Sequence, residues 1–418
     1  MRVLHVSDWH LGRTTYKESR ASDHDAVLAE IIGLARTERP DLICHTGDLF
    51  DQARPSYPDM VRGIAALQDL AAVAPVVVVA GNHDSPMLFT VFGQLLGPGS
   101  RIHFVPEPCR PSDGGVLRFP GADGTTLRLG VLPFVHANRI VNAFDDPEDW
   151  RGVYADRVGK MEQEIAAGLL DNFDDRNEVA MFAAHLYVGG ANLSGSENHI
   201  TGYYATNVDC IPSLAYAAFG HIHKPQPLAT AQLEGRYAGS PLQLDFGEAG
   251  EQKSVVLVDV RPGWAAEVNV IDLAAGRRLR RFDGTIEELR RMAPTVDNEL
   301  CLITISTSTH DPTLSDKVRD LLPKAVVVQL TEKCADRKLD IVTEESVADD
   351  AEPDIQQLFH DYLVDQGTKG AAADRVLQTF TDLLASVVNN DVPMLAEEEL
   401  LTMPIDFCQT SATSEEPS

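Results

Sequence analysis

The stretch LICHTGDLFD at residues 42–51 joins an apolar run to a turn that carries two carboxylates. Its first part, Leu42–His45, predicts a buried strand, because a short apolar run that ends in turn residues is typical of a strand covered on both faces. Gly47 follows, and Asp48 and Asp51 lie just beyond the carboxyl end of the strand. Acidic side chains at that end of a strand are candidates for one side of a binding site.

Two other segments repeat this arrangement. The strand candidate Val3–Val6 leads into Asp8–Trp9–His10, and Val76–Ala80 leads into Gly81–Asn82–His83–Asp84. Between the strands, apolar residues recur at helical spacing, as in residues 27–35. Alternating strands and helices predict an α/β fold with buried sheets. Further strand candidates in the first 260 residues are Leu129–Pro133, Val179–Ala183, Ala217–Gly220, Arg236–Ala238 and Val255–Val260.

Two histidine clusters complete the set. His185 follows Val179–Ala183, and Gly220–His221–Ile222–His223 follows the strand candidate at residues 217–220. Because ligands collect at the carboxyl ends of strands in α/β sheets, we expect all five clusters to converge on one edge. Taken singly, each has a plain structural interpretation, such as a turn or a satisfied buried histidine. The five together, each at a strand end, favour one functional site.

The residue types of these clusters suit a two-metal centre. Two divalent cations about 3.5–4 Å apart can hold a phosphodiester, lower the pKa of a water and neutralise a leaving oxygen. Strand-like alternation is expected to turn Asp8 and His10 the same way, and His221 and His223 likewise. Glycines beside the acidic, amide and histidine clusters let the chain turn sharply. Carboxylate, amide and imidazole ligands without a thiolate favour manganese, iron or magnesium over structural zinc.

The rest of the chain predicts further domains. After a first domain at residues 1–270, the pattern changes and predicts a small α+β domain at residues 277–345. Glu344–Asp354 is interpreted as a linker, residues 355–390 as a helical region, and the polar, acidic residues 411–418 as a disordered tail. The small domain is expected to hold helices at Ile286–Met292 and Leu314–Leu322 and strands at Leu300–Ile305 and Ala325–Leu330. The helical region has apolar residues at helical spacing, namely Ile355, Leu358, Phe359, Tyr362, Val376, Phe380, Leu383, Leu384 and Val387.

The chain is strongly acidic, with a formal net charge of −28. About 19 acidic residues against 4 basic ones lie between Ala335 and Ser418, so roughly half of the excess is in the last fifth of the chain. This acidity argues against strong autonomous DNA binding. A local basic stretch nevertheless contains Arg13, Lys17 and Arg20. These three are candidates for contact with a DNA backbone, although a solvated helix face explains them equally well.

Several classes of protein are disfavoured by what the sequence lacks. The six cysteines are scattered singly, so neither a disulfide scaffold nor a Cys-x-x-Cys site is expected. There is no Gly-x4-Gly-Lys-Ser/Thr loop of a P-loop ATPase and no Gly-x-Ser-x-Gly elbow of a serine hydrolase. Without a signal peptide or an apolar run of about 18 residues, the protein is predicted to be soluble and cytoplasmic, with no membrane association.

The order Asp-x-His, Gly-Asp-x-x-Asp, Gly-Asn-His-Asp, His and Gly-His-x-His resembles the calcineurin-like metallophosphoesterase superfamily. Within it, Ser7–Asp8–Trp9–His10–Leu11–Gly12 and Gly239–Ser240–Pro241 resemble the D subunits of bacterial SbcCD nucleases, counterparts of the eukaryotic Mre-type nucleases. The motifs cover residues 1 to about 250. The resemblance implies a metallophosphoesterase β-sandwich flanked by helices, with a small α+β capping domain and a C-terminal helical region.

The resemblance also implies roles for individual residues. One cation would take Asp8, His10, Asp48 and His223, and the other would take Asp48, Asn82, His185 and His221, with Asp48 shared. His83 would donate a proton to the leaving oxygen or stabilise charge on it. Asp51 resembles the acidic partner that orients this histidine, and Asp84 is the alternative. The cations implied are Mn²⁺, with Mg²⁺ or Fe²⁺ as alternatives.

By resemblance, the chain is expected to act in DNA end processing, repair and recombination. The family cuts double strands as a 3′→5′ exonuclease and single strands or hairpins as an endonuclease, in a heterotetramer that joins a homodimer of such chains to an SbcC-type coiled-coil ATPase. The helices at 355–390 are the expected docking segment. Two alternatives remain: a phosphodiesterase or phosphatase for small nucleotides or phosphoproteins, and a non-catalytic scaffold for an ATPase.

Overall fold

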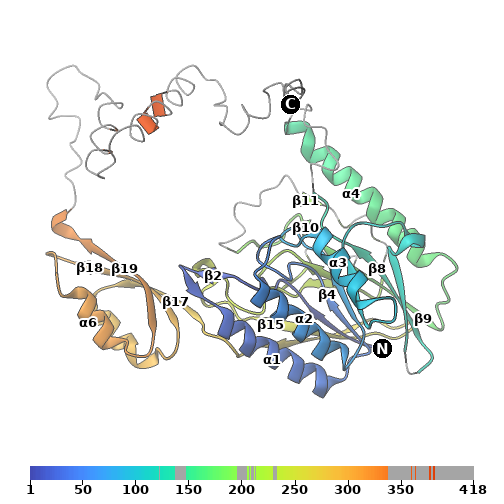
Figure 1. The fold of residues 1–418 in the computed structure, drawn as a ribbon, viewed down its shortest axis with the longest axis horizontal. Helices are drawn as coiled ribbons and strands as arrows, with labels where there is room; N and C mark the ends of the chain where they lie inside the picture. Colours follow the sequence, from blue (N-terminus) through green and yellow to red (C-terminus); the bar gives the residue numbers. More distant parts are fainter. Residues whose placement is uncertain are drawn as a thin grey trace, which may run out of the picture. The chain divides into compact units, whose positions relative to one another are not determined.

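The computed structural model describes residues 1–121, 123–136, 147–194, 205–206, 208, 211, 213–228 and 233–337, together with six residues near the C-terminus: Phe359, Leu363, Val376, Leu377, Phe380 and Thr381. The chain divides into two compact units, Met1–Arg337 and Lys338–Ser418. Figure 1 shows the ribbon coloured along the sequence.

The first of two large sheets contains the strands that precede three of the predicted clusters. Its order is β16-β15-β1-β4-β5-β6, in which β1, β4, β5 and β6 run parallel and β15 and β16 are antiparallel additions. The strands are β1 (Arg2–Val6), β4 (Leu42–His45), β5 (Val76–Val79), β6 (Ile102–Val105), β15 (Ser254–Asp259) and β16 (Glu267–Asp272).

The second large sheet supplies the two histidine clusters. Its order is β13-β14-β12-β9-β8-β7, with β14, β12, β9 and β8 parallel and an antiparallel strand at each edge. The strands are β7 (Val116–Pro120), β8 (Thr126–Leu132), β9 (Glu178–His185), β12 (Tyr216–Gly220), β13 (Gln226–Pro227) and β14 (Gly235–Tyr237).

The two sheets pack face to face, because alternate residues of each strand point to opposite faces. In β4, Leu42 and Cys44 belong to the apolar cluster shared by both sheets, whereas Ile43 belongs to a second cluster under helices. That second cluster lies beneath α1 (Ala21–Glu38), α2 (Tyr57–Ala71) and α3 (Pro86–Leu96). On the outer face of the other sheet, α4 (Pro147–Leu170) covers a third cluster. The expected α/β fold, a β-sandwich flanked by helices, is confirmed.

Most strands lie where the apolar runs predicted them, and the elements that were missed have mixed or exposed patterns. β4 and α5 (Ile286–Met292) have the predicted bounds. By contrast, β16 was missed, and although it contains Val268, Val270 and Ile271, none of its residues is fully buried. The other unpredicted elements include α3, α4, β6, β7, β13 and β17 (Leu279–Gly284). They also include two short strand pairs, β2 (Thr14–Thr15) with β3 (Glu18–Ser19) and β10 (Tyr187–Val188) with β11 (Ala205–Thr206).

A smaller sheet follows the sandwich in the sequence. β17 (Leu279–Gly284), β18 (Leu300–Thr307) and β19 (Val326–Cys334) are parallel, and α5 and α6 (Leu314–Leu321) pack on them through a separate apolar cluster. The helix α5 begins at a capping box in which Thr285 and Glu288 satisfy each other's backbone N–H groups. The strands and helices expected here are present.

Little of the second unit is described. The rings of Phe359 and Phe380, one from each predicted C-terminal helix, stack with centroids 4.0 Å apart. Leu363 is buried, and the Thr381 hydroxyl donates to the Leu377 carbonyl one helical turn earlier. The linker Glu344–Asp354, the tail 411–418 and the predicted helix positions Ile355, Leu358, Tyr362, Leu383, Leu384 and Val387 lie outside the described residues. Among described helices, none is long and apolar enough to cross a membrane.

Arg20 forms a buried clasp between α1 and the segment that leads into β17. Its side chain is fully buried and pairs with Asp23 at 2.6 Å. It also donates to the carbonyls of Gln243 (2.8 Å) and Arg277 (2.9 Å), and Arg277 returns an ion pair to Asp23 at 2.9 Å. The prediction that Arg20 contacts DNA is therefore wrong, because no part of its charge faces solvent. Lys17, in contrast, is exposed.

Replacing Arg20 tests this structural role. Arg20→Ala should lower the free energy of unfolding by about 3–5 kcal/mol, because it leaves the buried Asp23 and two carbonyls short of a partner. Lys17→Ala is the control and should change it by less than about 0.5 kcal/mol. Urea denaturation followed by circular dichroism measures both. An Arg20→Ala protein of normal stability and weakened DNA affinity would contradict the clasp.

Candidate metal centre

The ends of five parallel strands bring the predicted site residues together. Asp8 and His10 follow β1, Asp48 and Asp51 follow β4, and Asn82 and His83 follow β5 in one sheet. His185 ends β9, and His221 and His223 follow β12 in the other. Within β9 and β12, His185 pairs with Gly220, which sets the two histidine clusters level with each other. All nine side chains lie in one continuous group of contacts.

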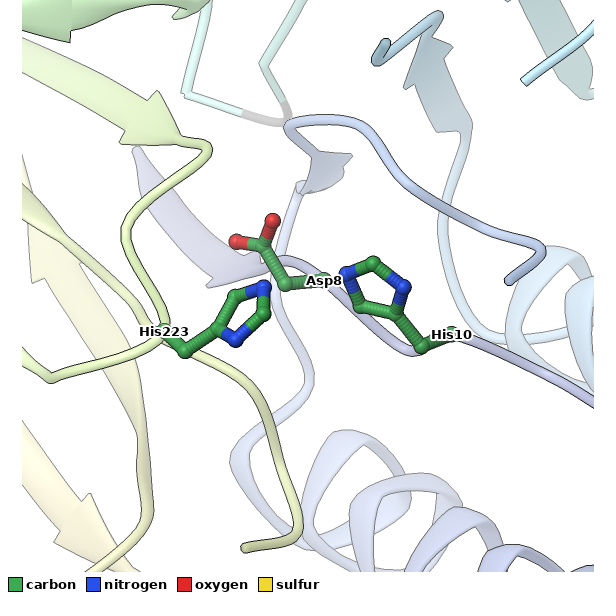
Figure 2. A group of neighbouring side chains, drawn as sticks. All are labelled: Asp8, His10 and His223. Carbon is green, nitrogen blue, oxygen red and sulfur yellow. The ribbon is translucent and has the colours of Figure 1, made fainter. Parts of the chain in front are cut away.

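One subgroup contains Asp8, His10 and His223. One potential ligand atom from each lies within 4.8 Å of the others, and all three residues are buried. Figure 2 shows the Asp8 carboxylate near the imidazoles of His223 and His10. The two rings meet edge to face with centroids 4.8 Å apart. The Asp8 carboxylate also accepts the backbone N–H of His221 at 3.1 Å, which ties the first strand to the second sheet.

A second subgroup contains Asn82, His185 and His221. The Asn82 Oδ1 atom lies 3.0 Å from His185 Nε2 and 2.9 Å from His221 Nδ1, and these two nitrogens are 3.3 Å apart. The ring of Phe134 stacks on His221 at 5.7 Å, so one side of this group is apolar. One amide and two imidazole groups at such distances are suited to hold a divalent cation.

Asp48 joins the two subgroups. Its Oδ2 atom lies 3.5 Å from His10 Nε2 and 3.4 Å from His185 Nε2. Its Oδ1 atom accepts the backbone N–H of His83 at 2.8 Å. A fully buried carboxylate between two sets of donors is the arrangement that a bridge between two cations requires.

The backbone at this centre adopts conformations that side chains other than glycine rarely take. Asp8, His10, Asp48 and His221 have φ of 51°, 47°, 52° and 97°. Asp8 and His10 do reach one site, as expected, but not through strand alternation, because β1 ends at Val6 and both residues have positive φ. Such conformations cost about 1–3 kcal/mol each and persist where the surrounding structure imposes them.

Two glycines allow the close approach of the donors. A Cβ atom at Gly47, where φ is +110°, would lie 2.1 Å from the His185 ring nitrogen Nδ1. A Cβ atom at Gly81 would lie 2.1 Å from the Asp48 carboxylate. Any side chain at either position would displace a predicted ligand, so the glycines next to the clusters have a steric reason to be there.

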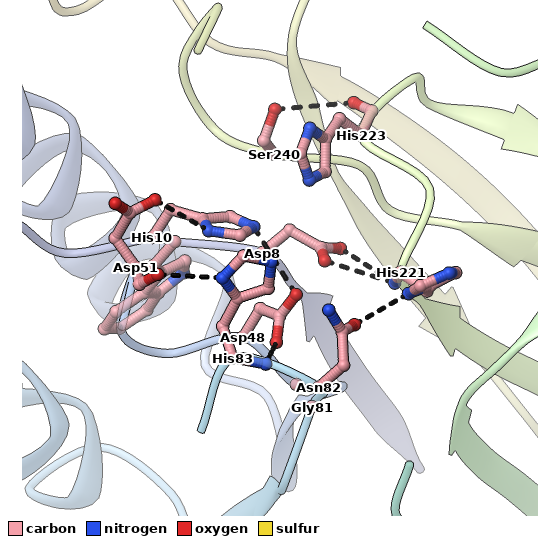
Figure 3. Close-up of polar contacts among 12 residues, drawn as sticks. Asp8, His10, Asp48, Asp51, Gly81, Asn82, His83, His221, His223 and Ser240 are labelled. Atoms are coloured by element: carbon pink, nitrogen blue, oxygen red, sulfur yellow. Dashed lines mark hydrogen bonds and ion pairs between the residues drawn. The ribbon is translucent and has the colours of Figure 1, made fainter. Parts of the chain in front are cut away.

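Asp51 holds His83 through its backbone and not through its carboxylate. The Asp51 carbonyl accepts from His83 Nδ1 at 2.8 Å, whereas its carboxylate lies 3.3 Å from both His10 Nδ1 and Arg13 Nη1. Asp84 does not reach His83; its buried carboxylate accepts the backbone N–H groups of Leu49, Phe50 and Gly81. Figure 3 shows the contact between Asp51 and His83.

Burial sets the direction of the pKa shift for His10 and His221, whereas neighbouring charges outweigh burial for Asp48 and His185. Burial raises the pKa of Asp48, but the nearby His185, His10 and His83 outweigh burial and hold it well below its usual range. Burial lowers the pKa of His185, but the Asp48 carboxylate outweighs burial and raises it to about 9. The pKa values of His10 and His221 are lowered, mainly by burial. Burial and the Asp48 charge raise the pKa of Asp84 to about 7.

The residues present fit a pair of divalent cations. The ring nitrogens of His10 are buried 3.3 Å from the Asp51 carboxylate and 3.5 Å from the Asp48 carboxylate, yet neither contact has good hydrogen-bond geometry, so both nitrogens can serve another ligand. The donors are carboxylate, amide and imidazole groups, as harder divalent ions prefer. Arg13 is half-buried against Asp51, and Lys17 is exposed; their contact with DNA stays a prediction.

The sequence did not indicate two groups that hold predicted ligands. The Thr46 carbonyl accepts from His185 Nδ1 at 2.8 Å, and a backbone oxygen carries no sequence signal. The Glu248 carboxylate lies 3.1 Å from His223 Nδ1. Burial raises the pKa of Glu248, but Lys253 and the His223 hydrogen bond outweigh burial and hold it below its usual range. In the sequence, Glu248 is distinguished only as an acidic residue between two apolar segments.

Cation binding at this centre should release a proton. Because the pKa of His185 is about 9 without a cation, its ring is protonated at pH 7, and a cation must displace that proton. The affinity for Mn²⁺ should therefore rise by up to about tenfold per pH unit between pH 6.5 and 8.5. Isothermal calorimetry in two buffers of different ionisation enthalpy counts the protons. An affinity that is the same at both pH values would contradict the charged His185.

The sequence and the fold were compared with those of known proteins. Residues 1–225 match the calcineurin-like phosphoesterase family. The D subunit of the SbcCD nuclease of Bacillus subtilis is 33% identical over 288 residues, which cover 68% of this chain and 72% of that protein. The protein of the same name in Escherichia coli K12 is 28% identical over 310 residues, covering 69% and 72%. A dimetal phosphatase from Danio rerio superposes with a TM-score of 0.41 at 12% identity, over 66% of this chain and 98% of that one. From the family match and the Bacillus relative, the chain belongs to the calcineurin-like phosphoesterase family, among the D subunits of SbcCD nucleases.

Proposed function

We propose that this chain is the nuclease subunit of an SbcCD-type complex and hydrolyses DNA phosphodiesters in a metal-dependent reaction. The observation that carries the proposal is the single, mostly buried group of contacts formed by the predicted ligands and His83. The relatives that share this part of the chain are nucleases by name. Cleavage of double strands in the 3′→5′ direction and of single strands and hairpins is part of the proposal.

The proposed ligands divide between two cations. Asp8, His10 and His223 would hold one, and Asn82, His185 and His221 the other, in agreement with the two subgroups of contacts. Asp48 would be shared, since its Oδ2 atom lies within 3.5 Å of both subgroups. When bound, such cations hold the phosphodiester and make a water more acidic. We propose Mn²⁺ because the site mixes oxygen and nitrogen donors without a thiolate.

His83 is proposed to act on the leaving oxygen. Its backbone N–H donates to Asp48 and its Nδ1 faces the Asp51 carbonyl at 2.8 Å, so the Nε2 atom is left for the substrate. Its ring meets that of His10 edge to face at 4.8 Å, which places it beside the first subgroup. A ring fixed in this way can donate a proton to the leaving group without first reorienting.

We further propose that the C-terminal helices dock an SbcC-type coiled-coil ATPase. The relatives' name refers to one subunit of a larger nuclease, and this chain has no P-loop motif. The stacked Phe359 and Phe380 rings indicate that the two helices pair through apolar faces. The acidic charge between Ala335 and Ser418 would complement a more basic partner. In this proposal residues 277–345 cap the nuclease domain.

A homodimer is proposed through the outer helices. On α3, Met87, Val91 and Leu95 lie at intervals of four residues and are 72%, 40% and 79% exposed. On α2, Tyr57 and Val61 are 83% and 69% exposed. Apolar side chains repeated along one face of a helix and left in solvent mark an association surface. A second copy of the chain would cover them.

The acidity of the chain favours one alternative, a phosphodiesterase for small nucleotides. A net charge of −28 repels a polyanion more than it repels a mononucleotide. Such an enzyme would need neither the C-terminal helices nor a dimer. A non-catalytic scaffold is disfavoured, because all the predicted ligands are present and close together.

The nuclease proposal predicts Mn²⁺-dependent cleavage of an end-labelled DNA duplex and a hairpin. His83→Ala should lower the cleavage rate by about 10²–10⁴-fold, the usual contribution of a general acid, and leave Mn²⁺ binding intact. His310→Ala is the matched control, since His310 is exposed and pairs with Glu332 outside the sandwich. Gel assays with and without the ATPase partner measure the rates. Intact DNA together with hydrolysis of a small nucleotide would favour the alternative.

The dimer proposal is tested by placing a charge on the apolar face of α3. Leu95→Glu should convert the dimer to a monomer, because it places a carboxylate in the buried part of the interface. Val270→Glu is the control, because Val270 is also exposed but lies on β16, one edge strand of the first sheet. The helix α3 packs beside β6, which is the other edge strand. Sedimentation velocity gives the mass. A wild-type monomer at micromolar concentration would contradict the dimer.

A further inference from the structure

His223 is held on three sides by Ser240, Glu248 and Lys253, of which the last two lie outside the sequence motifs. Its ring Nδ1 atom lies 3.1 Å from the Glu248 carboxylate. Its backbone carbonyl accepts from Ser240 N–H at 3.0 Å and from the Lys253 ammonium at 2.9 Å. The Ser240 hydroxyl also lies 3.5 Å from that carbonyl, as Figure 3 shows. The Gly239–Ser240–Pro241 motif thus lies against a predicted metal ligand.

Glu248 is itself fixed at both oxygens. It lies in the short 3₁₀ turn Phe246–Glu248 and is fully buried. One oxygen faces His223, while the other lies 2.8 Å from Lys253 and accepts the backbone N–H of Leu244 at 3.1 Å. Lys253 is also almost fully buried. The carboxylate therefore has one geometry in which all these partners are satisfied.

A buried ion pair of this kind needs a reason other than stability. Taking a carboxylate and an ammonium out of water is expensive, and apolar side chains of similar volume often replace such pairs without loss of stability. Here the pair contacts the ring and the backbone of the same residue, His223, from two directions. In His185, by comparison, the Nδ1 atom faces the neutral Thr46 carbonyl.

We propose that Glu248 is a positioning residue for His223: it keeps the proton on Nδ1, turns Nε2 toward the metal centre and makes the imidazole a stronger donor. Lys253 anchors Glu248 and fixes the His223 backbone. A carboxylate behind a metal-binding histidine has this effect in general, and its loss costs about 10–100-fold in metal affinity. This inference rests on the proposed role of His223 as a ligand.

The test compares two carboxylates that share one lysine. Glu248→Ala removes the contact with His223, and Glu248→Gln keeps an oxygen that can still accept the Nδ1 proton. Glu251→Gln is the matched control, because Glu251 pairs with the same Lys253 ammonium at 3.0 Å. The full-length proteins are titrated with Mn²⁺ by electron paramagnetic resonance, which counts bound ions and gives each affinity.

We expect Glu248→Ala to lower the affinity for one of two Mn²⁺ ions by about 10–100-fold. Glu248→Gln should lower that affinity less, and Glu251→Gln should leave both affinities unchanged. In the metal-free protein, ¹⁵N spectra of labelled histidine should show His223 protonated on Nδ1 in the wild type and in Glu248→Gln, and as a mixture of tautomers in Glu248→Ala. If Glu248→Ala does not fold, the comparison of Glu248→Gln with Glu251→Gln still tests whether Glu248 positions His223.

Two results would overturn the inference: wild-type Mn²⁺ affinity in Glu248→Ala, or an equal loss in Glu251→Gln, which would assign the effect to Lys253. The proposed nuclease function fails separately. If the wild type binds two Mn²⁺ ions and leaves DNA intact, while Glu248→Ala loses one ion, the positioning role stands without the nuclease activity.

Discussion

The carboxylate of Asp48 lies fully buried, 3.5 Å from a ring nitrogen of His10 and 3.4 Å from one of His185. An ion so far from water persists only where opposite charges and N–H groups surround it. The loops after β1 and β5 and the end of β9 each supply such a partner, so their positions depend on this one group. The left-handed backbone of Asp48 and the absence of a side chain at Gly81 follow from the same crowding.

The protein fixes which nitrogen of each imidazole faces the centre. His83 and His185 direct Nδ1 to the carbonyls of Asp51 and Thr46, and His223 directs Nδ1 to Glu248, so Nε2 is the inward atom in all three. His221 is different, because its Nδ1 lies against Asn82 and His185. The donor geometry is therefore set before any cation binds, which is what a preorganised site requires.

The sequence predicted the buried strands and the residues at their ends because both have local signals, an apolar run and a polar turn. It could not predict which atom of a residue makes a contact. Asp51 contributes its carbonyl to His83, although its carboxylate was the obvious candidate. Arg20 resembled a surface cation, yet it pairs with Asp23 and carbonyls far along the chain. Glu248 meets His223 only through the fold, since 25 positions separate them.

The negative charge of the chain repels DNA, its proposed substrate, but bound cations would change the charge locally at the site. Two divalent cations would outweigh the carboxylates of Asp8 and Asp48 and reverse the field where a phosphodiester has to lie. Much of the remaining negative charge lies beyond Ala335, in the part of the chain proposed to meet a partner. Cation binding and partner binding would each remove negative charge that repels DNA, so each would favour substrate binding. DNA affinity would then depend on the assembled, metal-loaded complex and not on a basic surface of this chain.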